Sequence, residues 1–208
     1  MKLETKAFAN GGIIPEKYAF GKVDPETHVT LSDNWNPGFT WSGLPSGTQS
    51  LALICHDPDA PSRPDNVNKE GKVVGKEVPR VDFYHWVLVD IPVTLEGIQE
   101  GAVSNGVSPK GKHFGPMPEG IAGVNSYTDW FAGDPDMGGY YGGYDGPCPP
   151  WNDVLVHHYH FTLFALDVET LGLGDKFTGP TAIAAMEGHI LDKARWSGTY
   201  SLNPASED

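Results

Sequence analysis

The 208-residue sequence has few basic side chains and no long hydrophobic run. Its 14 lysines and arginines stand against 27 aspartates and glutamates, which gives a formal net charge of −13. This excess of negative charge repels nucleic-acid backbones and anionic membrane surfaces, so neither is expected as the main partner. No stretch of about 18 apolar residues is present, so no membrane-spanning helix is predicted. The N-terminal residues lack the apolar core of a signal peptide, which favours a cytoplasmic protein.

Cysteine is also scarce. Cys55 and Cys148 are too few for a four-cysteine metal site, and no CxxC motif is present. In a reducing compartment both are expected as free thiols, although a disulfide or a redox role stays open. A zinc site would therefore need histidines, of which His158 and His160 have a suitable spacing. No clear third and fourth ligand accompanies them, so no metal and no cofactor are predicted.

Helix-favouring runs are few, whereas glycine (26 residues) and proline (18 residues) are plentiful. This composition is typical of a β-rich chain with many turns. Apolar segments predict strands over residues 50–56, 81–92, 157–167 and 197–202. The stretches between them are rich in proline, glycine and charge and are expected to be irregular, above all residues 58–80, 100–126 and 134–153. Strands joined by long connections favour a single all-β domain over residues 1–208, built as a Greek-key antiparallel β-sandwich.

One helix is predicted in the C-terminal region, within residues 177–196. Thr178 is a suitable N-cap, and Pro180 lies in the first turn, where a missing N–H costs little. One face of this helix would carry four apolar residues at helical spacing, namely Ile183, Met186, Ile190 and Ala194. We expect the helix to pack on the sandwich.

Three histidines and a tyrosine stand at the start of the predicted strand 157–167, where apolar packing does not need them. In an extended strand, alternation places His157 and Tyr159 on one face, and His158 and His160 on the other. Both faces become apolar further along, so each polar pair lies at one end of a buried strand. These side chains are candidates for a ligand pocket, a metal site, a catalytic site or ordinary hydrogen bonding at a solvated strand end.

A further histidine lies in the predicted strand 81–92. By the same alternation, His85 is expected to share a face with Val87 and Val89, while Trp86 points to the other face.

The sequence also carries an ordered set of motifs. In chain order they read "NWNPGFTWSGLPSGTQSLAL", "HDPDAPSRP", "YHWVLVDIP", "GPCPP", "HHYHFTLFALD" and "MEGHILDKARWSGTY". Any one of them alone is weak, because a "DPDAP" can be only a turn. Together, from about residue 3 to residue 203, they resemble the phosphatidylethanolamine-binding proteins, especially the bacterial and archaeal branch called Raf-kinase-inhibitor-like.

The resemblance implies a pocket for a small anion. In the family this pocket takes phosphate, phosphorylated head groups or carboxylates such as acetate. Family members have been linked to kinase regulation and to peptidase inhibition, and bacterial relatives often look dimeric. A kinase, a peptidase or a second copy of the chain is therefore an implied partner, although the residues themselves do not point to one. The residues that match the family's pocket are Asp57, Asp59, His85, Gly146, Pro147, His157 and Tyr159.

This set of residue types suits an anion. The ring N–H groups of His85 and His157 and the O–H of Tyr159 can supply short, charge-assisted hydrogen bonds. A carboxylate behind a histidine fixes its tautomer and favours its charged form, and Asp57 or Asp59 is expected to do this. The two aspartates could instead only cap turns.

Glycine and proline are expected in the wall of this pocket. Gly146 would let the backbone come close to the ligand, and the prolines beginning with Pro147 would reduce the entropy lost on binding. Cys148 follows directly and is expected either as a packed thiol under the loop or as an oxidisable thiol at the pocket mouth.

Two departures from the family pattern bear on the ligand. His158 stands where many relatives have an arginine. The stretch 126–145 is long, and it would bring four acidic residues near the mouth: Asp129, Asp134, Asp136 and Asp145. Their charge disfavours large anionic partners or selects for a cationic group on the ligand. The aromatic residues of this stretch, together with Trp151, could form a lid or pack onto the sandwich.

Three functions are compatible with these residues. The first is non-catalytic binding of a small anion that modulates a protein partner. The second is a hydrolase with His85, His157 and Asp57 as base and orienting groups, for which no nucleophile other than Cys148 is near. The third is an inhibitor or scaffold that acts through the surface loops 62–80 and 126–145.

Overall fold

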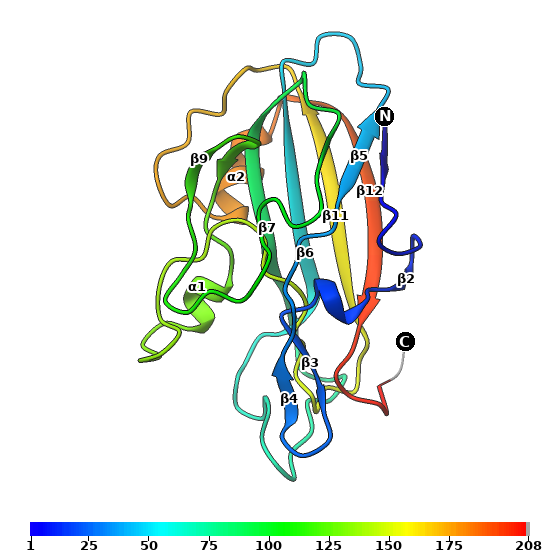
Figure 1. Ribbon diagram of the computed structural model, residues 1–208, viewed down its shortest axis with the longest axis vertical. Coiled ribbons are helices and arrows are strands. Elements are labelled where there is room, and N and C mark those ends of the chain that lie inside the picture. Colours follow the sequence, from blue (N-terminus) through cyan, green and yellow to red (C-terminus); the bar gives the residue numbers. More distant parts are fainter. Residues whose placement is uncertain (207–208) are drawn as a thin grey trace.

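A seven-stranded sheet forms the centre of the protein, seen in a computed structural model that describes residues 1–206 (Figure 1). Its strand order is β2-β12-β11-β6-β7-β10-β9. The strands are β2 (Gly12–Ile13), β6 (Ser50–Pro61), β7 (Arg80–Pro92), β9 (Gly115–Met117), β10 (Gly120–Ala122), β11 (His157–Leu166) and β12 (Ile190–Tyr200). A second sheet has the order β1-β5-β8, with β1 (Lys2–Glu4), β5 (Phe39–Ser42) and β8 (Gly97–Ile98).

The connectivity is that of a Greek key. β6 and β7 pair as an antiparallel hairpin, and β10 pairs with the far side of β7. β11 then returns to pair with β6 and not with β10, which is the return that defines this motif. All named strand pairs among residues 1–206 are antiparallel except β12 with β2. The predicted all-β Greek-key sandwich is therefore confirmed.

The main core lies between the two sheets. Alternate residues of the long strands, such as Leu53 of β6 and Phe161 of β11, are fully buried and face the smaller sheet. Phe39 of β5 meets Phe161 with ring centroids 4.9 Å apart. This alternation follows from the period of two along a strand and fixes which side chains of β11 point towards the core.

The opposite face of the large sheet is covered by helix α2 (Gly179–Met186). Ala182 and Met186 pack there against β6 and β7, so the predicted packing of a helix on the sandwich is correct. The predicted extension of this helix to residue 196 is wrong. Gly188 has a φ of +83° and ends the helical path, and β12 follows directly. Ile190 and Ala194 are four residues apart, which places them on one face of a helix but equally on one face of a strand.

A bulge in β7 overturns the face predicted for His85. Trp86 pairs with Cys55, but the next pair of β6 and β7 joins His56 to Tyr84, so His85 has no partner on β6. In such a bulge two successive side chains can point to the same side. Trp86 lies in the main core, and Val87 belongs to the cluster under α2. His85 therefore does not share a face with Val87 and points instead towards β11.

Three smaller elements lie near one end of the long strands. These are the 3₁₀ turn η1 (Glu16–Tyr18), the hairpin of β3 (Gly21–Asp24) with β4 (His28–Leu31), and the short helix α1 (Tyr127–Trp130). Figure 1 shows the hairpin and the 62–80 loop extending beyond the ends of β6 and β7, with α1 to one side.

Residues 62–79 are irregular, as predicted. The prediction of irregular structure is wrong for residues 58–61, which extend β6, and for parts of 100–126, which form β9 and β10. The side chain of Asn152 makes several of the hydrogen bonds that organise the 62–80 loop. Asn152 accepts a hydrogen bond from the backbone N–H of Asn68 (3.0 Å) through its Oδ1 atom. Its Nδ2 atom donates to the carbonyl groups of Asn66 (2.9 Å), Lys72 (3.0 Å) and Lys69 (3.3 Å). The loop is thereby tied to the segment that precedes β11.

In residues 1–206 no helix is long and apolar enough to cross a membrane.

Candidate functional site

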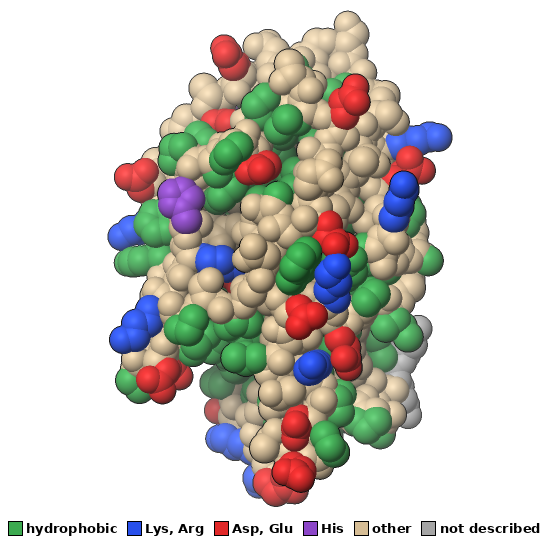
Figure 2. Space-filling model, in the orientation of Figure 1, with side chains coloured by type: hydrophobic (Ala, Val, Ile, Leu, Met, Phe, Trp, Pro, Cys, Tyr) green, Lys and Arg blue, Asp and Glu red, His purple; other side chains and the backbone are tan. Residues whose placement is uncertain are grey.

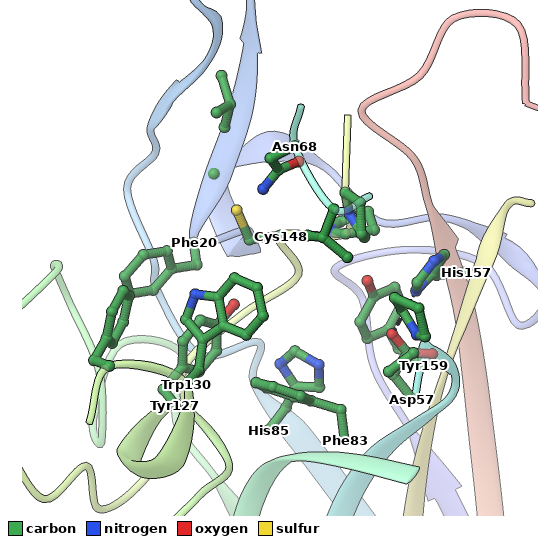
Figure 3. Close-up of a pocket in the computed structure, with 18 of the residues that line it drawn as sticks. Phe20, Asp57, Asn68, Phe83, His85, Tyr127, Trp130, Cys148, His157 and Tyr159 are labelled. Atoms are coloured by element: carbon green, nitrogen blue, oxygen red, sulfur yellow. Dashed lines mark hydrogen bonds and ion pairs between the residues drawn. The ribbon is translucent and has the colours of Figure 1, made fainter. Parts of the chain in front are cut away.

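A cavity of about 500 Å³ lies at this end of the large sheet. Its wall is mostly apolar and aromatic, with a few polar side chains among the lining residues. Figure 3 shows Asp57, His157 and Tyr159 on one side of it, Phe20, Tyr127 and Trp130 on the other, and His85 between them. Four of the seven predicted site residues line the cavity, namely Asp57, His85, His157 and Tyr159. The alternation along β11 correctly placed the last two together.

His157 is held between two carboxylates. Its Nδ1–H donates to Oδ2 of Asp57 at 2.6 Å, and its Nε2–H donates to Oδ2 of Asp153 at 3.1 Å. All three side chains are almost completely buried. Burial alone would lower the pKa of His157, but the charge of Asp57 and the hydrogen bonds to both aspartates raise it to about 9. His157 is therefore an imidazolium at neutral pH, and both of its N–H groups are occupied.

Asp153 is shared between His157 and Arg80. The guanidinium donates to the two carboxylate oxygens of Asp153 at 2.5 and 3.1 Å. Burial would raise the pKa of Asp153, but the hydrogen bonds from His157 and Arg80 outweigh it and keep this pKa low. The charges of two carboxylates, one imidazolium and one guanidinium thus balance each other, with Asp57 and His157 at the cavity wall and Asp153 and Arg80 behind it. Neither Asp153 nor Arg80 was predicted; the only sequence signal is an acid four residues before His157.

His85 presents a different arrangement. Its Nδ1–H donates to the backbone carbonyl of Asp145 at 2.8 Å, and the backbone N–H of Asp145 donates to the carbonyl of His85 at 3.0 Å. Within residues 1–206 nothing hydrogen-bonds to its Nε2 atom. Burial lowers the pKa of His85, and the nearby Asp57 offsets this only in part. His85 is therefore neutral at neutral pH, with a lone pair on Nε2 at the cavity wall.

The hydroxyl group of Tyr159 is the unsatisfied donor of the site. It is buried and has no hydrogen-bond partner among the described residues. Burial, together with the charge of Asp57, raises the pKa of Tyr159 well above its usual value, so the phenol keeps its proton. The rings of Tyr159 and His85 lie edge to face with centroids 5.1 Å apart. A buried donor without a partner is costly, which makes this hydroxyl a natural contact for a ligand.

Asp59 does not line the cavity. Its Oδ2 atom accepts hydrogen bonds from the backbone N–H of His158 at 2.8 Å and from Nδ1 of the same residue at 2.9 Å. Asp59 thus holds the start of β11 from the other side of the sheet. Of the two aspartates, Asp57 is the one behind a pocket histidine, and it also accepts the backbone N–H of Asp59 at 2.7 Å.

Gly146 and Pro147 lie behind the cavity wall and not in it. A Cβ atom on Gly146 would lie 2.0 Å from the carbonyl oxygen of Tyr18, so glycine is needed for packing against η1. The carbonyl of Pro147 accepts the backbone N–H groups of Phe20 (2.9 Å) and Gly21 (3.2 Å). The following residues, Cys148 to Pro150, form the wall itself. Ligand contact by Gly146 and Pro147 stays a prediction for which this geometry offers no support.

The remaining histidines of β11 lie on the other face of the sheet. His160 pairs across the strands with His56, with ring centroids 5.4 Å apart, and its Nδ1 atom is hydrogen-bonded to Oγ of Ser197 at 2.8 Å. Among residues 1–206, no three histidine, cysteine, aspartate or glutamate side chains are arranged to hold a metal ion. The alternative of a zinc site on His158 and His160 therefore gains no support.

Both cysteines are free thiols. Cys55 is buried in the core, whereas Cys148 lines the cavity. Burial raises the pKa of Cys148 to about 12, so its thiol stays protonated and is a poor nucleophile.

The acidic stretch is less exposed to the cavity than expected. Asp145 is fully buried and bonded to Lys112 at 2.8 Å, and to the side-chain amides of Asn34 and Asn125, each at 2.8 Å. Of the aromatic residues nearby, Tyr144 is buried in the main core and Tyr141 in a small cluster with Phe20 and Tyr127, but Trp130 lies at the cavity wall and is 50% exposed. Whether any of these aromatic rings acts as a lid stays a prediction.

Acidic and basic side chains are interspersed on the face shown in Figure 2, and basic ones do not gather into a patch there. That nucleic acid is not the main partner stays a prediction.

The fold and the site together describe a Greek-key β-sandwich with a cavity at one end of its large sheet. Comparison with known sequences identifies the family of such proteins to which the chain belongs. It matches the family model described as phosphatidylethanolamine-binding protein over residues 4–201. The chain belongs to this family, as its motifs predicted.

Similar proteins occur in archaea and bacteria. A UPF0098 protein of Methanothermobacter thermautotrophicus is 33% identical over 200 residues, which cover 96% of this chain and 98% of that protein. The UPF0098 protein YbhB of Escherichia coli is 26% identical over 201 residues, with 97% and 100% covered. Neither carries the name of an enzyme.

Two solved structures share the fold. One is Escherichia coli YbcL, described as a new member of the mammalian family of phosphatidylethanolamine-binding proteins (PEBP). It superimposes with a TM-score of 0.67 at 22% identity, covering 96% of this chain and 97% of that one. CT736 of Chlamydia trachomatis, described as a putative homologue of the same family, gives a TM-score of 0.64 at 26% identity, with 96% of both chains covered.

Proposed function

We propose that the protein binds a small anion without transforming it, and that the acidic group of this ligand reaches the polar side of the cavity. The observation that carries this proposal is the pairing of two unsatisfied polar groups. The hydroxyl of Tyr159 and the Nε2 atom of His85 lie on adjacent rings at the wall, and neither has a partner within residues 1–206.

An oxygen of the ligand head group would satisfy both groups. Tyr159 donates its O–H, and His85 donates as soon as its Nε2 takes up a proton. A bound anion favours that protonation, because an opposite charge stabilises the imidazolium. Phosphate, a phosphorylated head group or a carboxylate provides such an oxygen, and the size of the cavity is in the range of small-molecule sites.

The test is calorimetric titration of the protein with inorganic phosphate and with acetate at several pH values. Binding is expected to strengthen as the pH falls towards the range in which His85 is charged, since the anion and the proton bind together. His85→Ala and Tyr159→Phe should each weaken binding, while His189→Ala, at an exposed pair with Asp167, serves as the matched control. Binding of both anions that is independent of pH and unaffected by either substitution contradicts the proposal.

A hydrolase is less well supported by the geometry. A general base needs a ring nitrogen free to accept a proton, but both nitrogens of His157 bond to carboxylates. His85 has a free nitrogen, yet the thiol in the cavity wall, Cys148, is held protonated by burial. Turnover of ester, phosphoester or peptide substrates that disappears in His85→Ala would favour the enzyme over the binding protein.

Action on a protein partner, such as a kinase or a peptidase, belongs to the same proposal. The 62–80 loop and the 126–145 stretch supply cavity residues, among them Val67 and Trp130. Ligand binding and loop-mediated inhibition would therefore be coupled, because the surface offered by these loops depends on what fills the cavity. Pull-down from a lysate with and without a saturating anion tests this coupling; equal capture in both states contradicts it.

A further inference from the structure

We infer that the cavity selects a monocarboxylic acid with an apolar body, an aryl or medium-length alkyl group, over a phosphorylated ligand, and that one proton is taken up on binding. This inference rests on the proposed binding function and narrows it to one ligand class. It follows from the hydrogen-bonding groups of the wall that have no partner, from the balance of charge at the wall, and from the apolar lining of the rest of the cavity.

The wall has few donors to spare. Both N–H groups of His157 are consumed by Asp57 and Asp153, and the Nδ1–H of His85 is consumed by a backbone carbonyl. The hydroxyl of Tyr159 is the one buried donor of the lining that has no partner within residues 1–206. A phosphate group with two negative charges needs several converging donors, whereas a carboxyl group needs one donor and one shared proton.

The charge of the wall also disfavours a dianion. The negative charges of Asp57 and Asp153 are balanced by His157 and Arg80, so no net positive charge remains for the ligand. The carboxylate of Asp57 itself lines the cavity and repels a phosphate. A carboxyl group that shares a proton with His85 brings no net charge into this neutral, buried environment.

The proton count follows from the same contacts. In water at neutral pH the ligand is a carboxylate, and the Nε2 atom of His85 carries no proton. An acceptor oxygen and an acceptor nitrogen cannot hydrogen-bond to each other, so one proton from solvent must enter between them. Tyr159 keeps its own proton and donates it to the second oxygen of the carboxyl group.

The body of the ligand must be apolar because the rest of the cavity is. Phe20 and Tyr127 stack with ring centroids 4.6 Å apart, and Phe83 meets Tyr127 edge to face at 5.1 Å. At the mouth, Leu31 is 57% and Trp130 50% exposed, although both line the cavity. A cavity of about 500 Å³ holds far more than a carboxyl group. Each methylene buried in it strengthens binding about fourfold.

Calorimetry with matched ligands tests the inference. The probes are octanoate, 4-phenylbutyrate, acetate and octyl phosphate, each titrated at neutral pH in two phosphate-free buffers with different ionisation enthalpies. We expect octanoate and 4-phenylbutyrate to bind more than about tenfold tighter than acetate, from burial of the body. Octanoate should also bind more tightly than octyl phosphate, with uptake of about one proton per ligand. Tyr159→Phe should weaken octanoate about tenfold, and the control His189→Ala should not change it.

The outcomes separate the inference from the binding function on which it rests. Octyl phosphate binding as tightly as octanoate, or octanoate binding without proton uptake, overturns the inference. If octyl phosphate binds best of the four probes and His85→Ala abolishes that binding, the proposed function stands while the inference fails. No binding of any of the four probes overturns both.

Discussion

The buried ion pair of His157 predicts a specific dependence of stability on pH. Its pKa rises from the ordinary value of 6.5 to about 9 in the folded protein. The folded state therefore holds this proton more tightly than the unfolded chain does. The resulting contribution to the free energy of unfolding is complete below about pH 6.5 and is lost as the pH rises through about 9.

The structure sets the magnitude of this effect. A pKa difference of one unit between the folded and unfolded states corresponds to about 1.4 kcal/mol. The rise from 6.5 to about 9 therefore gives an upper limit of about 3 to 4 kcal/mol. Solvent screening does little to reduce it, because the side chain of His157 is 1% exposed. Urea denaturation between pH 6 and pH 9 measures the free energy of unfolding directly.

Asp57→Asn supplies the comparison, because it removes the charge that contributes most to raising this pKa. The variant should be less stable than the parent chain at pH 6, and the difference should shrink towards pH 9. Cys55 and Cys148, whose pKa values burial raises, lower stability at high pH in both proteins and so cancel in the comparison. Parent stability that stays constant from pH 6.5 to pH 9 would refute the reasoning even if the variant does not fold.

Three further substitutions have expected outcomes. Tyr159→Phe should leave the free energy of unfolding in urea unchanged or slightly higher, because the hydroxyl it removes has no partner. A decrease of more than about 1 kcal/mol in this free energy would contradict the prediction. Gly146→Ala should lower the free energy of unfolding by about 2 kcal/mol in the same assay, because the new Cβ would lie 2.0 Å from the carbonyl oxygen of Tyr18 at the end of η1. The control Gly106→Ala should lower it much less, because a Cβ there meets nothing within 4 Å. Asn152→Ala should speed limited proteolysis within the 62–80 loop, because that loop loses four hydrogen bonds; an unchanged cleavage rate would show that other contacts hold it.

The sequence predicted the fold and part of the site because those features depend on regular local patterns. β11 runs without a bulge from its histidines to Phe164, so simple alternation correctly put His157 and Tyr159 on the cavity side. The same rule failed for His85, because the bulge in β7 depends on its pairing with β6. The end of α2 was missed because alternate residues of β12 also match helical spacing.

Residue types alone could not predict which hydrogen-bonding groups of the site are already occupied by other residues. His157 looked like a donor for the ligand, but its N–H groups are occupied by Asp57 and Asp153, and the latter is held by Arg80 from another strand. Gly146 matched a pocket wall, yet its backbone packs against η1. Such assignments depend on contacts between segments far apart in the chain, which no local pattern reports.

The measurement that tests the central claim most directly is nitrogen-15 NMR of the histidine side chains as a function of pH. The account predicts that both ring nitrogens of His157 stay protonated up to about pH 9. It also predicts that His85 at neutral pH carries its proton on Nδ1 alone, and that its bare Nε2 gains a hydrogen bond when a carboxylate ligand is added. A His157 that titrates near 6.5 with one bare nitrogen, or a His85 that is already charged at neutral pH, would contradict it.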